Sequence, residues 1–219
     1  ASGRAHAFAV VSDGIDQNAQ NWDSGDAFVL LDQLTVDINA SATAYGSDAT
    51  ADAFVRRGIQ QYAGVSSGYA SASILVDNLG VIARATATAT LESASAQASI
   101  DTGVSQVVYV GDGGDASGRI VIDEYATVAA IANAKADDTA NATARADWGV
   151  YQQVQNFGDG SAFATLDNNG ELHVNAIADA TGSDAYALAE NHQGVFVWAS
   201  AGGATTEGGD ANALIANDG

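Results

Sequence analysis

The chain contains no cysteine, no proline and no methionine among its 219 residues, whereas glycine occurs 24 times. The absence of cysteine excludes disulfide bonds and thiolate metal sites, and it leaves the redox compartment open. The absence of proline suits stacked β-strands, because proline cannot donate a hydrogen bond to a neighbouring strand, whereas glycine can occupy the corners between strands. These absences favour a chain rich in β-structure.

Positive charge is also scarce, since 7 Lys and Arg residues stand against 27 Asp and Glu residues and the formal net charge is −20. Such a chain repels nucleic acid and anionic membrane surfaces, so we expect neither as a partner. No apolar run approaches the roughly 20 residues that a membrane-spanning helix needs, so we expect no membrane insertion. The first residues show neither the basic nor the apolar region of a signal peptide, and we expect a mature or excised piece.

A short motif, Gly followed by Ile or Val, recurs along the chain at intervals of 44, 45, 46 and 45 residues. A fixed period of this size is typical of solenoids, propellers and other repeat arrays. We expect residues 1–219 to form a single continuous array of about five units, without a domain boundary, and to be a fragment of a longer chain. The units begin at Gly14, Gly58, Gly103, Gly149 and Gly194.

Within each unit, small or aliphatic residues alternate with polar residues, which is the period of a β-strand. Two segments of each unit read Ala-x-Ala-x-Ala, as in 85–89 and 94–98, and this spacing would give a helix no apolar face. An inward face of alanine predicts two sheets that approach closer than the usual distance of about 10 Å. The segment Asp77–Gly80 is rich in Asp, Asn and Gly, which predicts a turn that ends a strand.

From these patterns we expect an all-β fold, a β-solenoid, in which each repeat forms two coils of about 22–23 residues with two strands per coil. The alternative is one flattened coil of about 45 residues for each repeat. Glutamine recurs at the third position after the repeat Gly, facing inward, and predicts a ladder of amide hydrogen bonds. The ladder consists of Gln17, Gln61, Gln106 and Gln152.

The segment from Val150-Tyr151-Gln152 through Gly158-Asp159-Gly160 to Asn168 resembles the curlin-type repeat of bacterial functional amyloids. In that family, an aliphatic-x-Gln strand, a Gly/Asn turn and an x-Ala-x strand form one coil. The longer unit, with its Ala-x-Ala-x-Ala segments, looks like the Ala-rich repeats of very large surface proteins of Gram-negative bacteria. The resemblance implies a secreted β-solenoid that forms fibres or is displayed at the cell surface. One departure is that strands here end on aliphatic residues where curlin coils carry a second inward Gln or Asn.

Aromatic residues gather at the outward positions of the strand that follows each repeat Gly. We expect them to lie on one face of the rod, where they would contact another filament or bind a sugar. The alternative is that they are scattered or covered surface aromatics. The predicted strip consists of Tyr62, Tyr109, Tyr151, Phe196 and Trp198.

Acidic residues recur in the turn after this strand, among them Asp112, Asp115 and Asp159, with Asp23, Asp26, Glu207 and Asp210 at equivalent places. The sequences match neither the nonapeptide calcium repeat nor the EF-hand, so we expect solvated turns and no cofactor, with weak calcium binding as the alternative. The three histidines share no ligand spacing. We therefore expect no enzyme activity.

Together these features predict a structural subunit of an extracellular bacterial fibre, matrix or surface layer, which associates with itself end to end or laterally. The main alternative is the stalk of a large cell-surface adhesin that binds calcium or surface glycans. Two further alternatives are a β-helix polysaccharide lyase and an ice-binding protein. The lyase would need a basic groove, and the chain has a single lysine, Lys135.

Overall fold

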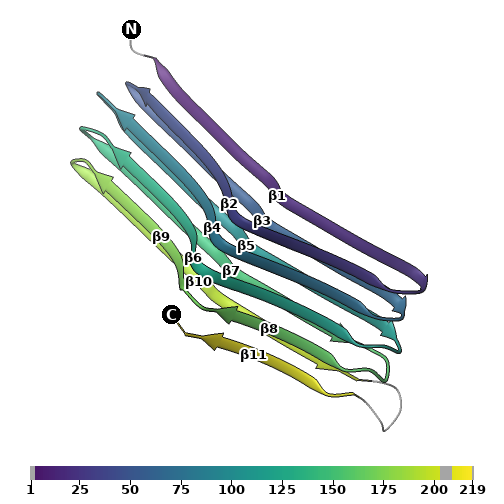
Figure 1. Ribbon diagram of the computed structural model, residues 1–219. Helices are drawn as coiled ribbons and strands as arrows, with labels where there is room; N and C mark the ends of the chain where they lie inside the picture. The colour runs from purple at the N-terminus through teal and green to yellow at the C-terminus, as the bar shows by residue number, and fades with distance from the viewer. Residues whose placement is uncertain (1–2, 203–208, 219) are drawn as a thin grey trace.

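The computed structural model describes residues 3–202 and 209–218, and these residues form parallel β-strands in two sheets (Figure 1). Sheet A has the strand order β1-β3-β5-β7-β10, and sheet B has the order β11-β8-β6-β4-β2 with β9 paired to β6. The strands are β1 (Arg4–Ser24), β2 (Ala27–Gly46), β3 (Asp48–Ser67), β4 (Ala70–Ala89), β5 (Ser93–Asp112), β6 (Ala116–Lys135), β7 (Thr139–Asn156), β8 (Ala162–Asn168), β9 (Glu171–Thr181), β10 (Asp184–Ala201) and β11 (Ala211–Asn217). The all-β solenoid-like stack predicted from the alternation is therefore present. Among the described residues, no helix is long and apolar enough to cross a membrane.

The prediction of two coils per repeat is wrong. Ala49 pairs with Ala94 in the next strand of sheet A, and Ala70 pairs with Ala116 in sheet B, so a coil returns to the same sheet after 45 or 46 residues. Residues 22 positions apart lie in opposite sheets. Each coil is thus wide and flattened, with one strand of about 20 residues in each sheet.

The predicted turn at Asp77–Gly80 is a bend inside β4, which continues from Ala70 to Ala89. Figure 1 shows that the long strands of both sheets change direction near their middle. The pairing of β4 with β6 is irregular between Val76 and Asn78, where β6 contains one residue more than β4. In the fourth repeat, the equivalent segment Asp167–Gly170 does interrupt the strand and separates β8 from β9. True reversals of direction occur elsewhere, for example at Gly25 and Gly68, whose positive φ angles of 142° and 127° favour glycine.

The predicted inward faces of the interior strands are buried, which confirms the register of the alternation there, whereas Ala185, Ala187 and Ala189 of the edge strand β10 are exposed. Ala85 and Ala87 of β4 and Ala94 and Ala98 of β5 are fully inaccessible, so the two sheets meet through methyl groups. Larger side chains, such as Ile59, Ile74 and Ile100, fill the space near the bend. This burial supplies the main driving force for folding, at about 25 cal/mol for each Å² of apolar surface removed from water.

At the repeat Gly of four coils, an aliphatic side chain of sheet B packs directly against the backbone of sheet A. A Cβ atom at Gly103 would lie 2.5 Å from Val128 Cγ2 of sheet B and 2.6 Å from the backbone oxygen of Gly149. The same combination of an aliphatic side chain and a neighbouring Gly oxygen surrounds Gly14, Gly58 and Gly149. None of these glycines has a positive φ, so the requirement is for space and not for backbone conformation.

The predicted glutamine ladder is present in the core. Gln61 Nε2 donates to Gln17 Oε1 at 2.8 Å, Gln106 Nε2 to Gln61 Oε1 at 3.0 Å, and Gln152 Nε2 to Gln106 Oε1 at 2.8 Å. The second amide hydrogen reaches across the core to sheet B, as from Gln61 Nε2 to the backbone oxygen of Ser73 at 2.9 Å. The buried amides are thus paired along the stack and across it, and they separate two clusters of buried apolar residues.

The ladder stops in β10, where Val197 occupies the position that pairs with Gln152 of β7. As a result, Gln152 Oε1 is buried and has no hydrogen-bond partner among the described residues. A buried polar atom without a partner lowers the free energy of unfolding by about 1–3 kcal/mol.

The first prediction concerns the repeat Gly. Gly103→Ala is expected to lower the free energy of unfolding by about 1–3 kcal/mol, because its Cβ would force the two sheets apart. Gly194→Ala is the matched control, since a Cβ there meets no atom within 4 Å. Chemical denaturation of both variants measures the difference, and equal effects would contradict the role of close packing.

The second prediction concerns the end of the ladder. Val197→Gln is expected to raise the free energy of unfolding by about 1 kcal/mol, because the new amide N–H can donate to Gln152 Oε1. Val195→Gln, two residues earlier on the same strand, offers no ladder acceptor and serves as the control. If both variants lose stability equally in urea denaturation, the orphaned oxygen does not limit the stability of this coil.

Candidate functional site

The five predicted aromatic residues all lie on the outer face of sheet A, but they do not form one strip. Tyr151 pairs with Phe196, whereas Tyr62 and Trp198 belong to the adjacent row through Val107 and Gln153. Tyr109 belongs to a third row, because it pairs with Gly64 and Gln155. The structure therefore divides the predicted strip among three rows of the sheet.

A compact aromatic cluster forms around Tyr151 and Phe196. Their rings are stacked with centroids 5.4 Å apart and planes 7° apart. The ring of Trp148 meets both edge-on, at 5.3 Å from Tyr151 and 5.6 Å from Phe196. Such pairs stabilise by about 0.5–1.5 kcal/mol beyond the burial of their area. Trp148 was not predicted, because it immediately precedes the repeat Gly149, where the strand bends and the alternation lapses.

The other members of the predicted strip make separate contacts. Tyr109 lies beside Phe157, with ring centroids 5.3 Å apart. The ring of Tyr62 covers Gly64, so that a Cβ at Gly64 would lie 2.6 Å from Tyr62 Cε1. Burial of Tyr62, and secondarily the nearby phenolate of Tyr109, raises the pKa of Tyr62. Trp198 remains 38% exposed.

Ionisable side chains surround the bend of sheet A next to Trp148. The Arg145 guanidinium pairs with the Asp147 carboxylate, which also lies 3.2 Å from His192 Nδ1. Partial burial, followed by the negative charge of Asp147, raises the pKa of Asp101, and Arg56 and Arg145 oppose that shift. The hydrogen bond with Asp147 raises the pKa of Arg145 further, so this guanidinium stays charged. The cluster thus combines fixed charges with one carboxyl group whose charged form is disfavoured.

The acidic turns lie between a strand of sheet A and the following strand of sheet B, as predicted. Their carboxylates bind backbone groups of the next coil: Asp26 Oδ1 accepts from the Tyr69 N–H at 3.0 Å, and Asp115 Oδ1 accepts from the Ser161 N–H at 2.8 Å. Asp112 ends β5, Asp159 lies between β7 and β8, and Glu207 lies outside the described residues. Within the described residues, no group of three or more His, Cys, Asp or Glu side chains is placed to hold a metal ion. Weak calcium binding remains a prediction.

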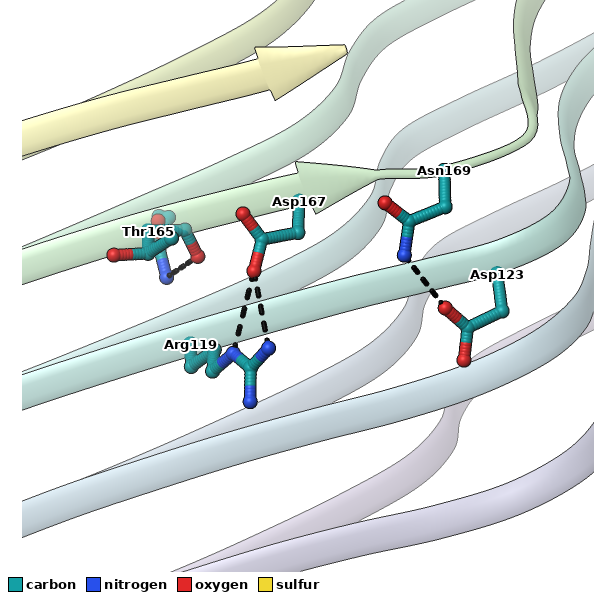
Figure 2. A network of polar contacts seen from close by, with 6 residues as sticks. Arg119, Asp123, Thr165, Asp167 and Asn169 are labelled. Atoms are coloured by element: carbon teal, nitrogen blue, oxygen red, sulfur yellow. Dashed lines mark hydrogen bonds and ion pairs between the residues drawn. The ribbon is translucent and has the colours of Figure 1, made fainter. Parts of the chain in front are cut away.

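The outer face of sheet B also carries polar contacts between neighbouring coils. Figure 2 shows the Arg119 guanidinium of β6 directed at the Asp167 carboxylate of β8, with Nη2 and Oδ2 3.1 Å apart. It also shows Asn169, whose Nδ2 donates to Asp123 Oδ1 at 2.8 Å. Exposed pairs of this kind contribute about 0–1 kcal/mol each. They stabilise the alignment of adjacent coils only slightly.

The three histidines lie on different strands and each faces a carboxylate. His6 Nε2 lies 3.1 Å from Asp52 Oδ2, and His173 Nε2 lies 3.1 Å from Glu171 Oε2. The His173 ring also lies against Tyr125, with centroids 5.4 Å apart. The structure therefore brings none of the histidines together with another.

Comparison with protein-family models, curated protein sequences and solved structures gives no match for this chain. The surface with the densest combination of aromatic and ionisable side chains is the bend of sheet A around Trp148, Tyr151 and Phe196. These three rings are half-buried, and their accessible edges, together with the neighbouring charges, can contact a partner or a sugar. The geometry of the chain itself carries the functional argument.

The third prediction concerns the charge of Asp101. Because its pKa is raised in the folded protein, the unfolded state binds fewer protons between the ordinary and the raised pKa, and ionisation of this carboxyl lowers stability. This loss is present above the raised pKa and disappears as the pH falls below the ordinary value of an Asp. Asp101→Asn should therefore raise Tm at pH 7, whereas Tm at about pH 3 should be unchanged. Calorimetry at both pH values decides, since an equal shift at each would point to packing and not to charge.

Proposed function

We propose that this array of about five repeats is a structural subunit of an extracellular bacterial fibre, matrix or surface layer. The observation that supports this most is the one-dimensional stack of strands, in which each coil pairs only with the coil before and the coil after it. Among the described residues, β1 and β10 are the edge strands of sheet A, and β2 and β11 are edge strands of sheet B. Edge strands offer unpaired backbone N–H and C=O groups to identical coils, which favours growth along the stack axis.

The charge of the chain supports end-to-end growth over lateral association. A formal net charge of −20 makes the sides of two stacks repel each other. At the ends of a stack, backbone hydrogen bonds and apolar burial oppose that repulsion. We therefore propose axial self-association, with lateral contacts limited to surfaces such as the aromatic cluster.

An extracellular bacterial location follows from the resemblance of 150–168 to curlin-type repeats and of the longer unit to Ala-rich surface proteins. The coil length departs from the curlin resemblance, because a coil here spans about 45 residues and a curlin-type coil about half of that. The proposal does not require amyloid behaviour.

The stalk of a cell-surface adhesin is the second candidate function. The half-buried aromatic cluster of Trp148, Tyr151 and Phe196 on the outer face of sheet A favours it, because a stalk that only spaces two domains apart needs no aromatic surface. The two candidates differ in one property: a fibre subunit polymerises, whereas an isolated stalk does not.

The fourth prediction tests polymerisation. Head-to-tail assembly should increase with salt, because the Debye length shortens from about 30 Å at 0.01 M to about 8 Å at 0.15 M and screens the repulsion between copies. Sedimentation velocity and electron microscopy across this range measure it. A protein that stays monomeric throughout at high concentration would contradict the fibre proposal and favour the stalk.

Two matched variants locate the contact. Leu188→Asp places a charge on the edge strand β10, whereas Thr143→Asp places the same charge on its partner position in the interior strand β7. Only the first should weaken assembly. Equal weakening would indicate a contact through the sides of the stack instead of its ends.

A further inference from the structure

The outermost strands at the two ends of the stack have complementary side chains. Figure 1 shows β1 at one end of the stack and β11 at the other. Among the described residues, β1, β2, β10 and β11 each pair with a strand on one side only. We propose that a second copy of this chain docks in a single register, with its β1 on β10 and its β2 on β11, in a contact that we call the joint. The inference rests on the proposed axial self-association and names the residues that meet.

The register of the joint follows from the rows of paired residues inside the chain. From coil to coil, each residue of a row pairs with the equivalent residue of the next repeat. Phe8 and Leu188, for example, stand at the two ends of one row, which runs through β3, β5 and β7. A copy that continues every row therefore places its Phe8 beside Leu188, at the strand spacing of about 4.8 Å.

Alanine lines the inner face of sheet A at both ends of the stack. Ala185 and Ala187 of β10 are exposed, whereas their partners in β7 are inaccessible. The rows that contain them begin with Ala5 and Ala7 of β1. Docking in this register covers methyl groups with methyl groups, which preserves the close approach of the two sheets.

Aliphatic side chains are exposed at both ends of sheet B. Leu30 of β2 is 59% exposed, and Leu214 and Ile215 of β11 are 52% and 54% exposed. Leu30 and Leu214 are the two ends of one row, and Leu31 and Ile215 are the two ends of the next. Between Leu30 and Leu214 the row is polar, so its aliphatic side chains stand only at the ends. The joint brings these ends together and removes apolar surface from water, which favours association.

Opposite charges meet where the strands of the joint begin. The side chain of Arg4 in β1 is 90% exposed, and its guanidinium lies 3.4 Å from the Asp48 carboxylate of the next coil. The row of Arg4 ends with Asp184 of β10, which is also exposed. Docking places this guanidinium between two carboxylates, one from each copy. The charges therefore favour the head-to-tail orientation.

The joint lacks two features of the contacts inside the chain. One amide hydrogen of Gln17 binds the Leu30 backbone oxygen, and the other faces Val197 of the docked copy, where the ladder has no acceptor. In the turns, Asp26 and Asp210 end one row, so like charges meet there. The joint is therefore weaker than the pairing of coils within one chain, and salt strengthens it by screening the two carboxylates.

Other arrangements of two copies fit less well. Head-to-head or tail-to-tail docking makes the paired strands antiparallel. It then sets the alanine half of each strand against the half with larger inward side chains, such as Ile15 in β1 and Val195 in β10. A parallel shift by one residue turns the alanines outward. A shift by two residues keeps them inward but separates Arg4 from Asp184.

The fifth prediction tests the register by disulfide cross-linking, which is specific because the chain has no native cysteine. A Phe8→Cys variant and a Leu188→Cys variant, both changed at outward positions, are mixed with oxidised glutathione at about 0.15 M salt. We expect a covalent dimer with one copy of each, because paired Cα atoms about 5 Å apart suit a disulfide. Within one copy the two positions lie four coils apart, about 19 Å, so the bond joins two copies. Non-reducing electrophoresis and mass spectrometry measure the dimer.

Two neighbouring positions provide the matched controls. Tyr186→Cys and Glu190→Cys lie two residues away on the same face of β10, where the diagonal distance of about 8 Å is too long for a disulfide. Each should cross-link to the Phe8→Cys variant about tenfold more slowly than Leu188→Cys does. Equal rates at the three positions, or dimers formed by either Phe8→Cys or Leu188→Cys alone, would overturn the register.

A second measurement uses the glutamine ladder and needs no cysteine. Val197→Gln extends the ladder from Gln152 and offers an amide oxygen to the free N–H of Gln17 in the docked copy. The association constant from sedimentation equilibrium should rise about fivefold. An unchanged or lower constant would contradict the joint. Copies that assemble in salt without the cross-link between Phe8→Cys and Leu188→Cys would overturn the joint alone, whereas copies that stay monomeric would overturn the fibre proposal with it.

Discussion

The close approach of the two sheets is the constraint on which the rest of the structure depends. Alanine lines both inner faces over half of each strand, and methyl groups fill a gap only if the sheets are near each other. Near the bend, Val128 of sheet B packs directly against the backbone of Gly103, where a side chain at position 103 would otherwise lie. A thin interior of this kind forces the chain into long strands and wide, flat coils.

The alternation of the sequence predicted the strands and their inner faces correctly, because burial depends on a period of two that is visible in the letters. The same alternation led to a wrong prediction of the number of coils in each repeat. A bend and a reversal both interrupt the alternation and both attract Asp, Asn and Gly, so Asp77–Gly80 read like a turn. The physical difference lies in the backbone: Gly25 and Gly68, at true reversals, have positive φ, and Gly80 does not. The sign of the φ angle at a glycine cannot be predicted from the residue types around it.

The candidate surfaces were predictable only as far as they depend on a single strand. The outward position of Tyr62, Tyr109 and Tyr151 follows from the alternation. Their division among rows follows from their different distances to the repeat Gly, since equivalent positions of the repeats pair with one another. Trp148 was missed because it lies at the bend.

The glutamine ladder gives the stack a direction. Gln61, Gln106 and Gln152 each donate to the glutamine of the preceding coil, so these side-chain amides point the same way along the axis. Hydrogen bonds aligned in this manner polarise one another, which makes the column act as a unit. Gln17 presents a donor face and Gln152 an acceptor face, and the two ends of the column are therefore chemically distinct. Like the plus and minus ends of a cytoskeletal polymer, they would accept a new coil by different chemistry.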